Sequence, residues 1–405
     1  MIFLIELTRG QAELLDRISN WYRNHIQGTI SQYRHPQWFA YSGAAGCGKT
    51  TVIRELIRTL GLSGSYIGCA YTGKAVLNML KQGLNAQTIH SLIYNVVPKY
   101  QTDPFSNRKS VGFEFELKKK LDRDYELIIV DEAPMVNDEM CQEILSFGIP
   151  VIFVGDMNQL PPVFGRSTIM ENPDFILTQI MRQSEDNPIV MLSQMVLKGI
   201  PLLEGRYGDS EVVREFVLDK KLLTDYDQIL CFTNNLRYEI NSFCRGKILG
   251  YDSPIPRIND KVICRQNNWS MEKDGFYLTN GTSGYIIDLD RSELARGYYL
   301  MDFHPDYFPN GVNFEKLKVD ARYMKMVPED QKNVMRTRNE KFEYAYAITV
   351  HLSQGSEYGR VLFIDSFFNT PELTKKARYT AITRAIDRIT IVTLGGSGRR
   401  EIERS

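Results

Sequence analysis

A glycine-rich run near residue 45 has the residue types and spacing that bind phosphate groups. Residues 43–50 read Gly-Ala-Ala-Gly-Cys-Gly-Lys-Thr, a full match to the pattern GxxxxGK[ST], between a strand pattern at 39–41 and a helical pattern at 51–60. Glycines let backbone N–H groups turn toward phosphate oxygens, and the helix that follows adds its positive end. A glycine turn that caps a helix by chance is the alternative, and the matching strand and helix patterns disfavour it. We expect a nucleoside triphosphate to lie against Gly43, Ala44, Ala45, Gly46, Cys47, Gly48, Lys49, Thr50 and Thr51.

Two adjacent carboxylates have the chemistry to complete this site. Asp131 and Glu132 follow the apolar run at 127–130, so we expect them at the end of a strand next to that of the glycine-rich run. Lys49 would reach the terminal phosphates, and Thr50 and Asp131 would hold Mg²⁺. Glu132 would orient or deprotonate the attacking water. Nucleotide hydrolysis needs a base as well as a metal ligand, and simple kinases often lack the second acid, so the pair favours hydrolysis. A strand that ends in a solvated acidic turn is the alternative, and the glycine-rich run disfavours it.

The elements that must position these residues alternate along the chain. Short β-branched or aromatic runs alternate with amphipathic stretches, which is typical of βαβ units around a parallel sheet. Four expected strands precede residue 160 and three follow residue 225, so we predict an α/β fold with two lobes. The strand ranges are 38–42, 66–70, 127–130, 151–154, 229–233, 361–365 and 389–394.

Two segments interrupt this alternation. Residues 96–121 carry Pro98, Pro104 and Gly112 between short apolar runs, which predicts a hairpin insertion. Residues 265–341 are rich in Tyr, Phe, Gly and Asn, with the turn signals Asp-Gly and Asn-Gly, which predicts a small inserted β module.

Composition excludes several classes of protein. Among the 405 residues, 43% are apolar and 24% charged, as in an ordinary globular protein. Forty-nine basic and 49 acidic side chains cancel, which argues against binding to a polyanion by overall charge but permits local basic grooves. Six scattered cysteines without a CxxC pair indicate a reducing compartment and no structural zinc. With no signal-peptide pattern and no apolar run of about 20 residues, we expect a cytoplasmic protein without a membrane partner.

Seven further motifs follow one another in a fixed order. They are Leu-Thr-Arg-Gly-Gln at 7–11, Tyr-Thr-Gly-Lys-Ala at 71–75, Thr-Ile-His-Ser at 88–91, Gly-Asp-Met-Asn-Gln-Leu-Pro-Pro at 155–162, Leu-Thr-Gln-Ile-Met-Arg-Gln at 177–183, Thr-Val-His-Leu-Ser-Gln-Gly at 349–355 and Tyr-Thr-Ala-Ile-Thr-Arg-Ala at 379–385. This ordered set resembles superfamily 1 helicases, and among them the 1B branch of the RecD and Dda type, over residues 7–392. The departures are modest, since Tyr71 stands where the family usually has Pro and Pro134 where it has Ser.

The resemblance implies a P-loop NTPase with two RecA-like parallel-sheet domains, a pin insertion and a small β-barrel insertion. It also implies an ATP- and Mg²⁺-dependent DNA helicase that moves 5′→3′ along single-stranded DNA in replication, recombination or repair. We expect it to act on forked or tailed duplexes as a monomer, with a replication or single-strand-binding protein as a candidate partner. The expected domains are 1–95 with 122–180, the pin at 96–121, 181–264 with 342–405, and the barrel at 265–341.

The resemblance also implies roles around the nucleotide. Gln11 would read the adenine edge, and Gln159 would sense the γ-phosphate or its attacking water. Arg182 and Arg384 would act as arginine fingers from the second lobe. Gln354 and Gly355 complete the expected nucleotide contacts. For Gln11, Arg182 and Arg384, a plain surface position is the alternative.

The expected nucleic-acid contacts combine polar groups with aromatic rings. Phe105 would wedge bases at the pin and Trp269 would stack a base, although each ring could instead pack against its own domain. His90 and His351 could equally be buried core histidines. The full set is Thr72, Lys74, Thr88, His90, Phe105, Trp269, Thr349, His351 and Ser353.

Two other functions stay open at this point. One is a helicase that acts on RNA, because no motif in the sequence indicates whether the protein contacts the 2′-hydroxyl that distinguishes RNA from DNA. The other is a switch that binds nucleic acid under the control of ATP but does not separate strands. Glu132 and the two candidate arginine fingers disfavour this alternative, because they are residues that ATP hydrolysis uses.

Overall fold

The structure is a computed structural model that describes residues 7–28, 34–102, 109–162, 165–179, 187–216, 219–251, 253–273, 276–306, 312–325, 339–366 and 370–393. The chain forms two compact units. The first unit comprises Met1–Met157 and Pro161–Met181, and the second unit comprises Asn158–Leu160 and Arg182–Ser405.

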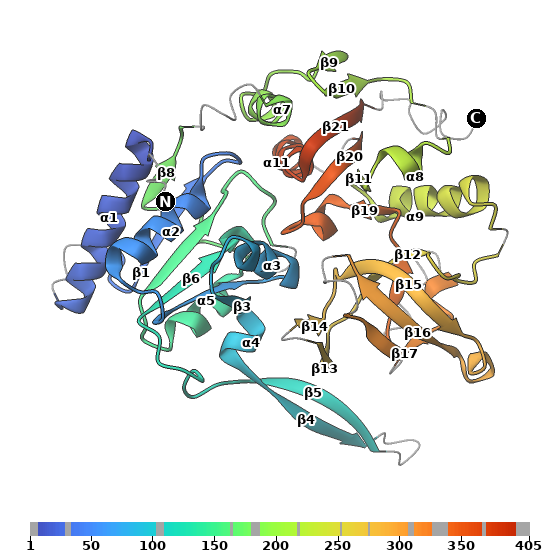
Figure 1. The fold of residues 1–405 in the computed structure, drawn as a ribbon, viewed down its shortest axis with the longest axis horizontal. Coiled ribbons are helices and arrows are strands. Elements are labelled where there is room, and N and C mark those ends of the chain that lie inside the picture. The colour runs from blue at the N-terminus through green and yellow to red at the C-terminus, as the bar shows by residue number, and fades with distance from the viewer. Residues whose placement is uncertain are drawn as a thin grey trace, which may run out of the picture. The chain divides into compact units, whose positions relative to one another are not determined.

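The first unit is built on a six-stranded parallel sheet with the order β3-β2-β6-β7-β1-β8. Its strands β1, β3, β6 and β8 are labelled in Figure 1. Its strands are almost continuously apolar because helices cover the sheet, as parallel sheets require. Buried residues of β6 and β7 share one core with residues of α4 and α5. The strands are β1 (Trp38–Gly43), β2 (Tyr66–Ala70), β3 (Ala86–Thr88), β6 (Leu127–Asp131), β7 (Val151–Gly155) and β8 (Phe175–Leu177).

The helices of this unit begin at polar caps that the sequence supplies. Thr8 and Gln11 form a capping box at the start of α1, and Thr72, Thr88 and Asn137 accept backbone N–H groups at three later helix starts. The helices are α1 (Arg9–Ile26), α2 (Lys49–Leu60), α3 (Gly73–Lys81), α4 (Ile89–Ile93), the short 3-10 helix η1 (Ala133–Met135) and α5 (Asp138–Leu145).

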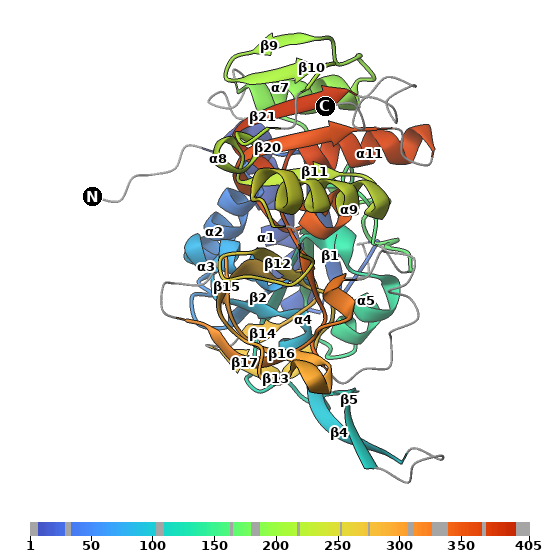
Figure 2. The ribbon, with the colours of Figure 1, turned by 90° about the vertical axis from the view of Figure 1, so that its right-hand side faces the viewer.

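A two-stranded antiparallel hairpin leaves this unit after α4. Strands β4 (Tyr94–Thr102) and β5 (Lys109–Leu117) pair in continuous register from Tyr94 opposite Leu117 to Thr102 opposite Lys109. The two views show the hairpin extending away from α4 (Figures 1 and 2). At its base, buried Lys118 donates to the carbonyl oxygen of Ser91 at 3.0 Å. The hairpin expected within residues 96–121 is therefore present and fixed to α4.

The second unit carries another six-stranded sheet, with the order β19-β11-β20-β21-β10-β9. All its pairings are parallel except that of β9 with β10. The strands are β9 (Gly205–Tyr207), β10 (Ser210–Val213), β11 (Gln228–Cys231), β19 (Ala347–Thr349), β20 (Tyr358–Asp365) and β21 (Ala385–Thr393). The helices are α7 (Pro188–Leu197), α8 (Leu222–Asp225), α9 (Asn234–Phe243), the π-helix η2 (Cys244–Ile248), the 3-10 helix η6 (Val350–Ser353) and α11 (Pro371–Ile382).

A five-stranded antiparallel sheet is inserted in the second unit between α9 and β19, with the order β17-β16-β15-β12-β18. Its strands are β12 (Lys261–Cys264), β15 (Ser283–Asp290), β16 (Tyr298–Pro305), β17 (Phe314–Asp320) and β18 (Phe342–Tyr344), accompanied by the pair β13 (Asn268–Lys273) and β14 (Phe276–Leu278) and the 3-10 helices η3 (Leu294–Arg296) and η4 (Tyr323–Lys325). One isolated bridge joins Val319 of β17 to Glu340, just before β18. A closed barrel remains a prediction.

The α/β fold class expected from the sequence is confirmed, and each of the seven expected strands corresponds to a strand of the two parallel sheets. The small sheet differs in extent from the expected module at 265–341. Strands β12 and β18 flank that range and pair with each other, so the sheet takes in residues on both sides of it. The alternating pattern of two such short strands does not reveal which sheet they join.

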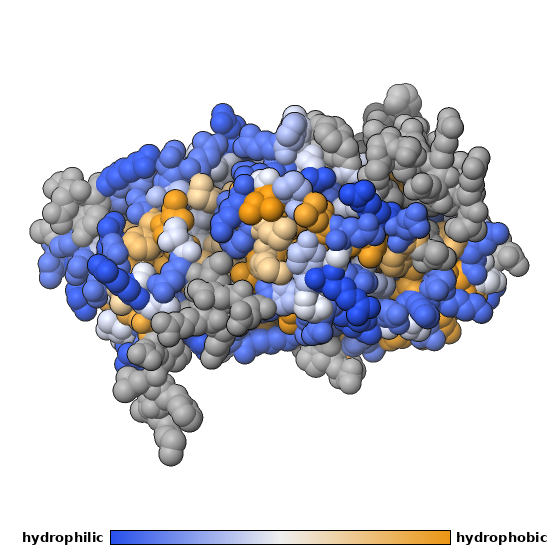
Figure 3. Space-filling model, turned by 90° about the horizontal axis from the view of Figure 1, so that it is seen from above, coloured by the Kyte–Doolittle hydropathy of each residue, from blue (hydrophilic) through white to orange (hydrophobic). Residues whose placement is uncertain are grey.

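The surface is mixed in polarity. On the face drawn in Figure 3, hydrophilic residues surround several separate hydrophobic areas. Exposed large apolar side chains such as Ile26, Leu203 and Ile386 come from different elements. Among the described helices, none is both long and apolar enough to cross a membrane.

Candidate nucleotide and nucleic-acid site

The carboxyl ends of the parallel strands bring the first unit's predicted site residues to one edge of its sheet. Ser42 of β1 lies opposite Gly155 of β7, and Ala70 of β2 lies opposite both Asp131 and Thr88. The loops that follow these strands therefore meet at the same edge, which is where open α/β sheets bind ligands. The prediction that β6 is the immediate neighbour of β1 is wrong, because β7 lies between them. Their shared parallel direction still places both carboxyl ends at this edge.

The phosphate loop has the backbone shape that its glycines allow. Gly46 and Gly48 adopt left-handed conformations with φ of 82° and 72°, which side chains of other residues rarely accept. Helix α2 begins directly after Gly48 without a side-chain cap on its first turn. Its N-terminal N–H groups are thus without a capping side chain at the positive end of the helix dipole, so the loop fits a polyphosphate.

Lys49 is folded over this loop. Its ammonium group donates to the carbonyl oxygens of Gly43 at 2.7 Å and Ala44 at 3.3 Å. The hydroxyl of buried Tyr41 donates to the carbonyl oxygen of Lys49 at 3.0 Å and so fixes the start of α2 to β1. The ammonium group of Lys49 therefore lies at the phosphate loop, bonded to two backbone carbonyl oxygens of that loop.

The acidic pair has an unusual backbone. The Glu132 N–H donates to the Asp131 carboxylate at 2.9 Å, and Glu132 itself has a φ of 51°. Left-handed conformations are uncommon for residues other than glycine and cluster at functional sites. Pro134 packs against Gly155, where a Cβ atom would lie 2.3 Å from the proline ring. The end of β7 thus needs glycine to accept the segment that carries the acids.

The donor set matches a cation shared with phosphate. Within the described part of the chain, no group of three or more His, Cys, Asp or Glu side chains could hold a metal ion by itself. Mg²⁺ is commonly held by one or two carboxylates together with substrate phosphates. Asp131 and Thr50 fit that arrangement, with the remaining ligands coming from phosphate and water.

Gln11 is held within the protein. Its side-chain oxygen accepts from the Thr8 N–H at 2.9 Å, and its amide nitrogen donates to the Cys47 carbonyl oxygen at 3.0 Å. Only 1% of the residue is exposed. The structure thus shows Gln11 joining the start of α1 to the phosphate loop. The adenine contact stays a prediction, as do the roles of the other site residues.

Cys47 is buried, and its thiol donates to the Leu177 carbonyl oxygen of β8 at 3.4 Å. Burial raises the pKa of the Cys47 thiol. The side chain therefore packs the loop against β8, and the nucleotide contact expected of Cys47 stays a prediction for its backbone.

Gln354 and Gly355 of the second unit lie close to Gln159, which was expected in the first lobe but groups with the second unit. Gln354 donates from its amide to the Leu160 carbonyl oxygen at 2.8 Å, next to buried Gln159. Gly355 is also buried and has a φ of 71°. The structure thus brings Gln159 and Gln354 together within one unit.

The two expected arginine fingers differ in what the structure describes. Arg384 is buried, and its guanidinium donates to the carbonyl oxygens of Thr380 at 3.2 Å and Ser356 at 3.1 Å and to the Thr383 hydroxyl at 3.3 Å. These bonds hold it between α11 and the segment after η6. Arg182 lies outside the described residues.

The first unit's expected nucleic-acid residues sit at the starts of α3 and α4. The hydroxyls of Thr72 and Thr88 accept N–H groups of Ala75 and Ser91, each at 3.2 Å, and so cap these helices. Lys74 follows in the first turn of α3. Burial lowers the pKa of His90 to about 4, so its ring is neutral at physiological pH.

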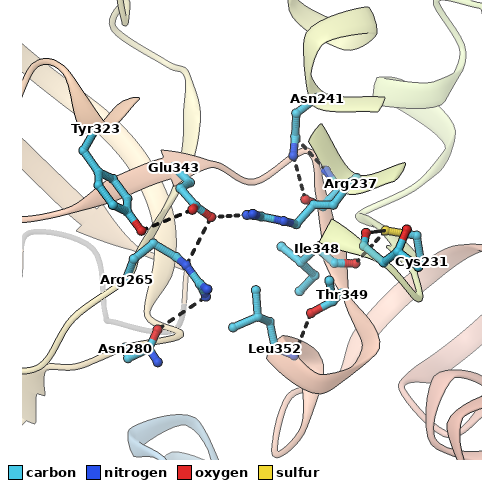
Figure 4. Close-up of polar contacts among 12 residues, drawn as sticks. Cys231, Arg237, Asn241, Arg265, Asn280, Tyr323, Glu343, Ile348, Thr349 and Leu352 are labelled. Atoms are coloured by element: carbon cyan, nitrogen blue, oxygen red, sulfur yellow. Dashed lines mark hydrogen bonds and ion pairs between the residues drawn. The ribbon is translucent and has the colours of Figure 1, made fainter. Parts of the chain in front are cut away.

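In the second unit, the expected contacts lie in η6 and at its N-cap Thr349, whose bond to Leu352 is drawn in Figure 4. The Thr349 hydroxyl accepts the Leu352 N–H at 3.4 Å, and the Ser353 hydroxyl donates to the Val350 carbonyl oxygen at 2.7 Å. Burial lowers the pKa of His351. Ser353 is fully buried, so its side chain shapes the turn. Phe105 and the Trp269 side chain lie outside what the structure describes.

Sequence reasoning missed a buried ion cluster that joins α9 to the small sheet. Glu343 of β18 contacts the guanidinium of Arg237 from α9, forms an ion pair with Arg265 at 3.1 Å, and accepts from the Tyr323 hydroxyl at 3.5 Å (Figure 4). Beside it, Asn241 exchanges two hydrogen bonds of 2.9 Å with the backbone of Ala347 in the edge strand β19. No local pattern links Arg237 to Glu343, which lie 106 positions apart.

Comparisons with known proteins match both units. A family model described as an AAA domain matches residues 27–165, and one described as a UvrD-like helicase C-terminal domain matches residues 344–392. The ATP-dependent RecD2 DNA helicase of Deinococcus radiodurans is 26% identical over 378 residues, which cover 86% of this chain and 46% of that protein. The RecBCD enzyme subunit RecD of Buchnera aphidicola is 23% identical over 421 residues, covering 85% and 67%.

Two solved structures share the fold. One, described as the basis for DNA unwinding at forked double-stranded DNA by two coordinating Pif1 helicases, has a TM-score of 0.54 at 19% identity and covers 96% of this chain and 93% of that chain. The other, Bacteroides Pif1 bound to single-stranded DNA, has a TM-score of 0.52 at 18% identity and covers 97% and 93%. The family models and the RecD2 relative support a superfamily 1B helicase of the RecD type, and the two solved structures support its fold. The family resemblance of the motifs is thus confirmed.

The chain is shorter than the first curated relatives that it matches. It spans 46% of the Deinococcus protein and 36% of an uncharacterized protein of Methanocaldococcus jannaschii, to which it is 25% identical over 429 residues. The family-model matches contain the phosphate loop and the acidic pair in the first unit and strands β19, β20 and most of β21 in the second.

Proposed function

We propose that this superfamily 1B chain hydrolyses ATP with Mg²⁺ and uses that energy to move 5′→3′ along single-stranded DNA and to separate forked or tailed duplexes. The observation that carries the proposal is the placement of the phosphate loop and the Asp131–Glu132 pair at one edge of a RecA-like sheet. A phosphate-binding loop and a general base at the same edge are what the hydrolysis of a nucleoside triphosphate requires.

The chain's own residues divide the chemistry among them. Bound ATP and Mg²⁺ would supply the phosphoanhydride bond and a cation that draws charge from the phosphates. Lys49 exchanges its acceptors at Gly43 and Ala44 for phosphate oxygens. Glu132, set off from the strand by its left-handed backbone, accepts the proton of the attacking water. Gln159 orients that water, and Arg384 and Arg182 neutralise charge on the transferred phosphoryl group.

Unwinding of duplexes that carry either a 5′ or a 3′ single-stranded tail tests the proposal. We expect the wild type to unwind the 5′-tailed duplex with ATP and Mg²⁺, and Lys49→Ala to abolish both unwinding and ATP hydrolysis. Lys198→Ala is the matched control, because Lys198 is an exposed lysine at the end of α7. Both activities should also disappear when EDTA removes Mg²⁺.

The same assay separates the other functions. Preference for the 3′ tail would contradict the direction of movement. Stronger stimulation of ATP hydrolysis by single-stranded RNA than by DNA would indicate an RNA-directed helicase. If single-stranded DNA binds but stimulates neither hydrolysis nor unwinding, the chain is an ATP-gated binding switch.

A further inference from the structure

The side-chain amide of Gln11 lies against the phosphate loop. Its nitrogen donates to the Cys47 carbonyl oxygen at 3.0 Å, and its oxygen accepts from the Thr8 N–H at 2.9 Å. Only 1% of the residue is exposed. Both polar atoms of the amide therefore face the protein, one toward the start of α1 and the other toward the loop.

The bond from Gln11 sets the direction of one peptide group in the loop. The peptide bond between Cys47 and Gly48 is trans, and in a planar trans peptide the carbonyl oxygen and the N–H point in opposite directions. Because the Cys47 oxygen points to Gln11, the Gly48 N–H points away from it. Successive backbone N–H groups that are turned to one side form the anion-binding concavity of a phosphate loop. Gln11 thus fixes one of these N–H groups where the loop meets α2.

Other contacts hold the same part of the loop. A Cβ atom at Gly48 would lie 2.3 Å from the Gln11 amide nitrogen, so the amide and the loop backbone are as close as glycine allows. The Cys47 N–H donates to the Ala44 carbonyl oxygen at 3.3 Å, and the Cys47 thiol donates to the Leu177 carbonyl oxygen at 3.4 Å. The N–H, the carbonyl and the thiol of Cys47 each have a partner, which holds the loop in one shape before a ligand binds.

Recognition of adenine makes a different demand on this amide. Adenine offers an acceptor at N7 and a donor at N6, which a glutamine meets with its amide nitrogen and oxygen together. In this chain those two atoms are bonded to Cys47 and Thr8, and the side chain is buried. To face a base, the side chain would have to leave both partners, and the Cys47 carbonyl would lose the bond that directs it. The geometry therefore favours a role in the loop over a contact with the base.

We propose that Gln11 is a positioning residue that holds the phosphate loop in its binding shape and does not select the base. The chain therefore accepts nucleoside triphosphates as a class, GTP as well as ATP, because the loop binds the triphosphate that they share. This inference rests on the proposed function, since it concerns the nucleotide of the same site. It differs from the adenine contact that the family resemblance implies for Gln11.

Hydrolysis of ATP and GTP with single-stranded DNA present, together with inhibition by inorganic tripolyphosphate, tests this role. We expect the wild type to hydrolyse GTP with a kcat/KM within tenfold of that for ATP. Gln11→Ala should weaken binding of ATP, GTP and tripolyphosphate by the same factor, about tenfold, as loss of one hydrogen bond does. Gln11→Met, which fills a similar volume without hydrogen bonding, should show the same uniform loss. A larger loss for ATP than for GTP and tripolyphosphate would overturn the proposal, because only a contact with the base distinguishes these ligands.

Two further variants separate the loop from the stability of α1. Thr8→Ala removes the hydroxyl that caps the helix but keeps the backbone N–H that bonds to Gln11. We therefore expect lower thermal stability and unchanged inhibition by tripolyphosphate. Gln27→Ala is the matched control, since Gln27 is an exposed glutamine at the other end of α1. Equal losses of tripolyphosphate binding in Thr8→Ala and Gln11→Ala would contradict a specific role in the loop.

Failure of this inference differs from failure of the proposed function. If the wild type hydrolyses ATP but uses GTP more than tenfold less efficiently, the inference alone fails. If it hydrolyses no nucleoside triphosphate even with single-stranded DNA, the proposed function fails together with it.

Discussion

The side-chain amide of Gln354 donates a 2.8 Å hydrogen bond to the carbonyl oxygen of Leu160, the residue after Gln159. On the other side, the Leu160 N–H donates to the hydroxyl of Thr380 in α11 at 3.0 Å, and that hydroxyl donates in turn to the Lys376 carbonyl oxygen at 2.8 Å. Both backbone groups of Leu160 are therefore satisfied by buried side chains of the second unit. This arrangement fixes the backbone next to Gln159.

Gln354 should consequently affect turnover more than nucleotide affinity. We expect Gln354→Ala to lower kcat for DNA-stimulated ATP hydrolysis about tenfold, because it leaves a buried carbonyl unpaired and loosens the backbone beside Gln159. The Kd for ATP should change less than twofold. Thr380→Val should act in the same direction, and Thr380→Ser should restore activity. A loss of ATP affinity as large as the loss in kcat would instead show a direct nucleotide contact. Steady-state kinetics and nucleotide titration supply both numbers.

Gly48 should be more sensitive than Gly61, although both have left-handed backbones with φ of 72° and 71°. A Cβ atom at Gly48 would lie 2.3 Å from the amide nitrogen of Gln11, whereas nothing lies within 4 Å at Gly61. We expect Gly48→Ala to abolish ATP binding, measured by nucleotide titration. Gly61→Ala should leave ATP binding intact and cost about 1 kcal/mol of stability from its backbone conformation alone. Equal effects in both assays would contradict this account of the loop.

Glu132→Gln should separate ATP binding from hydrolysis. The amide keeps the shape of the side chain but cannot accept the proton of the attacking water, so we expect hydrolysis to fall at least a hundredfold. Titration should show ATP affinity within a few-fold of the wild type. Retained hydrolysis would indicate that another group serves as the base.

The ion cluster around Glu343 should be important for stability. Arg237 and Glu343 have side chains only 5% and 6% exposed, so Glu343→Gln leaves buried guanidinium charge without its carboxylate. We expect a loss of about 3 kcal/mol in the free energy of unfolding of the second unit, followed by urea denaturation. Glu13→Gln is the control, because its ion pair with Arg17 is more than half exposed and contributes at most about 1 kcal/mol. Similar midpoints for the two variants would contradict this expectation.

Stability should depend on pH through His90. Because burial lowers the pKa of His90 in the folded protein from 6.5 to about 4, the unfolded chain takes up the proton first as the pH falls. The contribution of His90 is fully present above pH 6.5 and declines as the pH drops toward 4. Thermal unfolding of His90→Gln should show a shallower decline over this range than the wild type. Parallel declines would mean that other groups control the acid sensitivity.

The sequence by itself determined the elements whose information is local. Residues 43–50 specify a phosphate loop because the glycines, the lysine and the threonine that it needs are all close together in the chain. The parallel strands can be predicted from short apolar runs. The order of motifs along the chain likewise indicated the resemblance to RecD-type helicases that the family models and the RecD2 relative support.

Only the tertiary structure decided which of these elements meet. It placed β7 between β1 and β6, paired Glu343 with Arg237, and set the His90 ring beside those of Tyr71 and Phe115. These relationships depend on contacts between residues far apart in the chain or on the direction of one side chain. No repeat or spacing along a single chain records such contacts, because their free energy arises only when separate elements pack together.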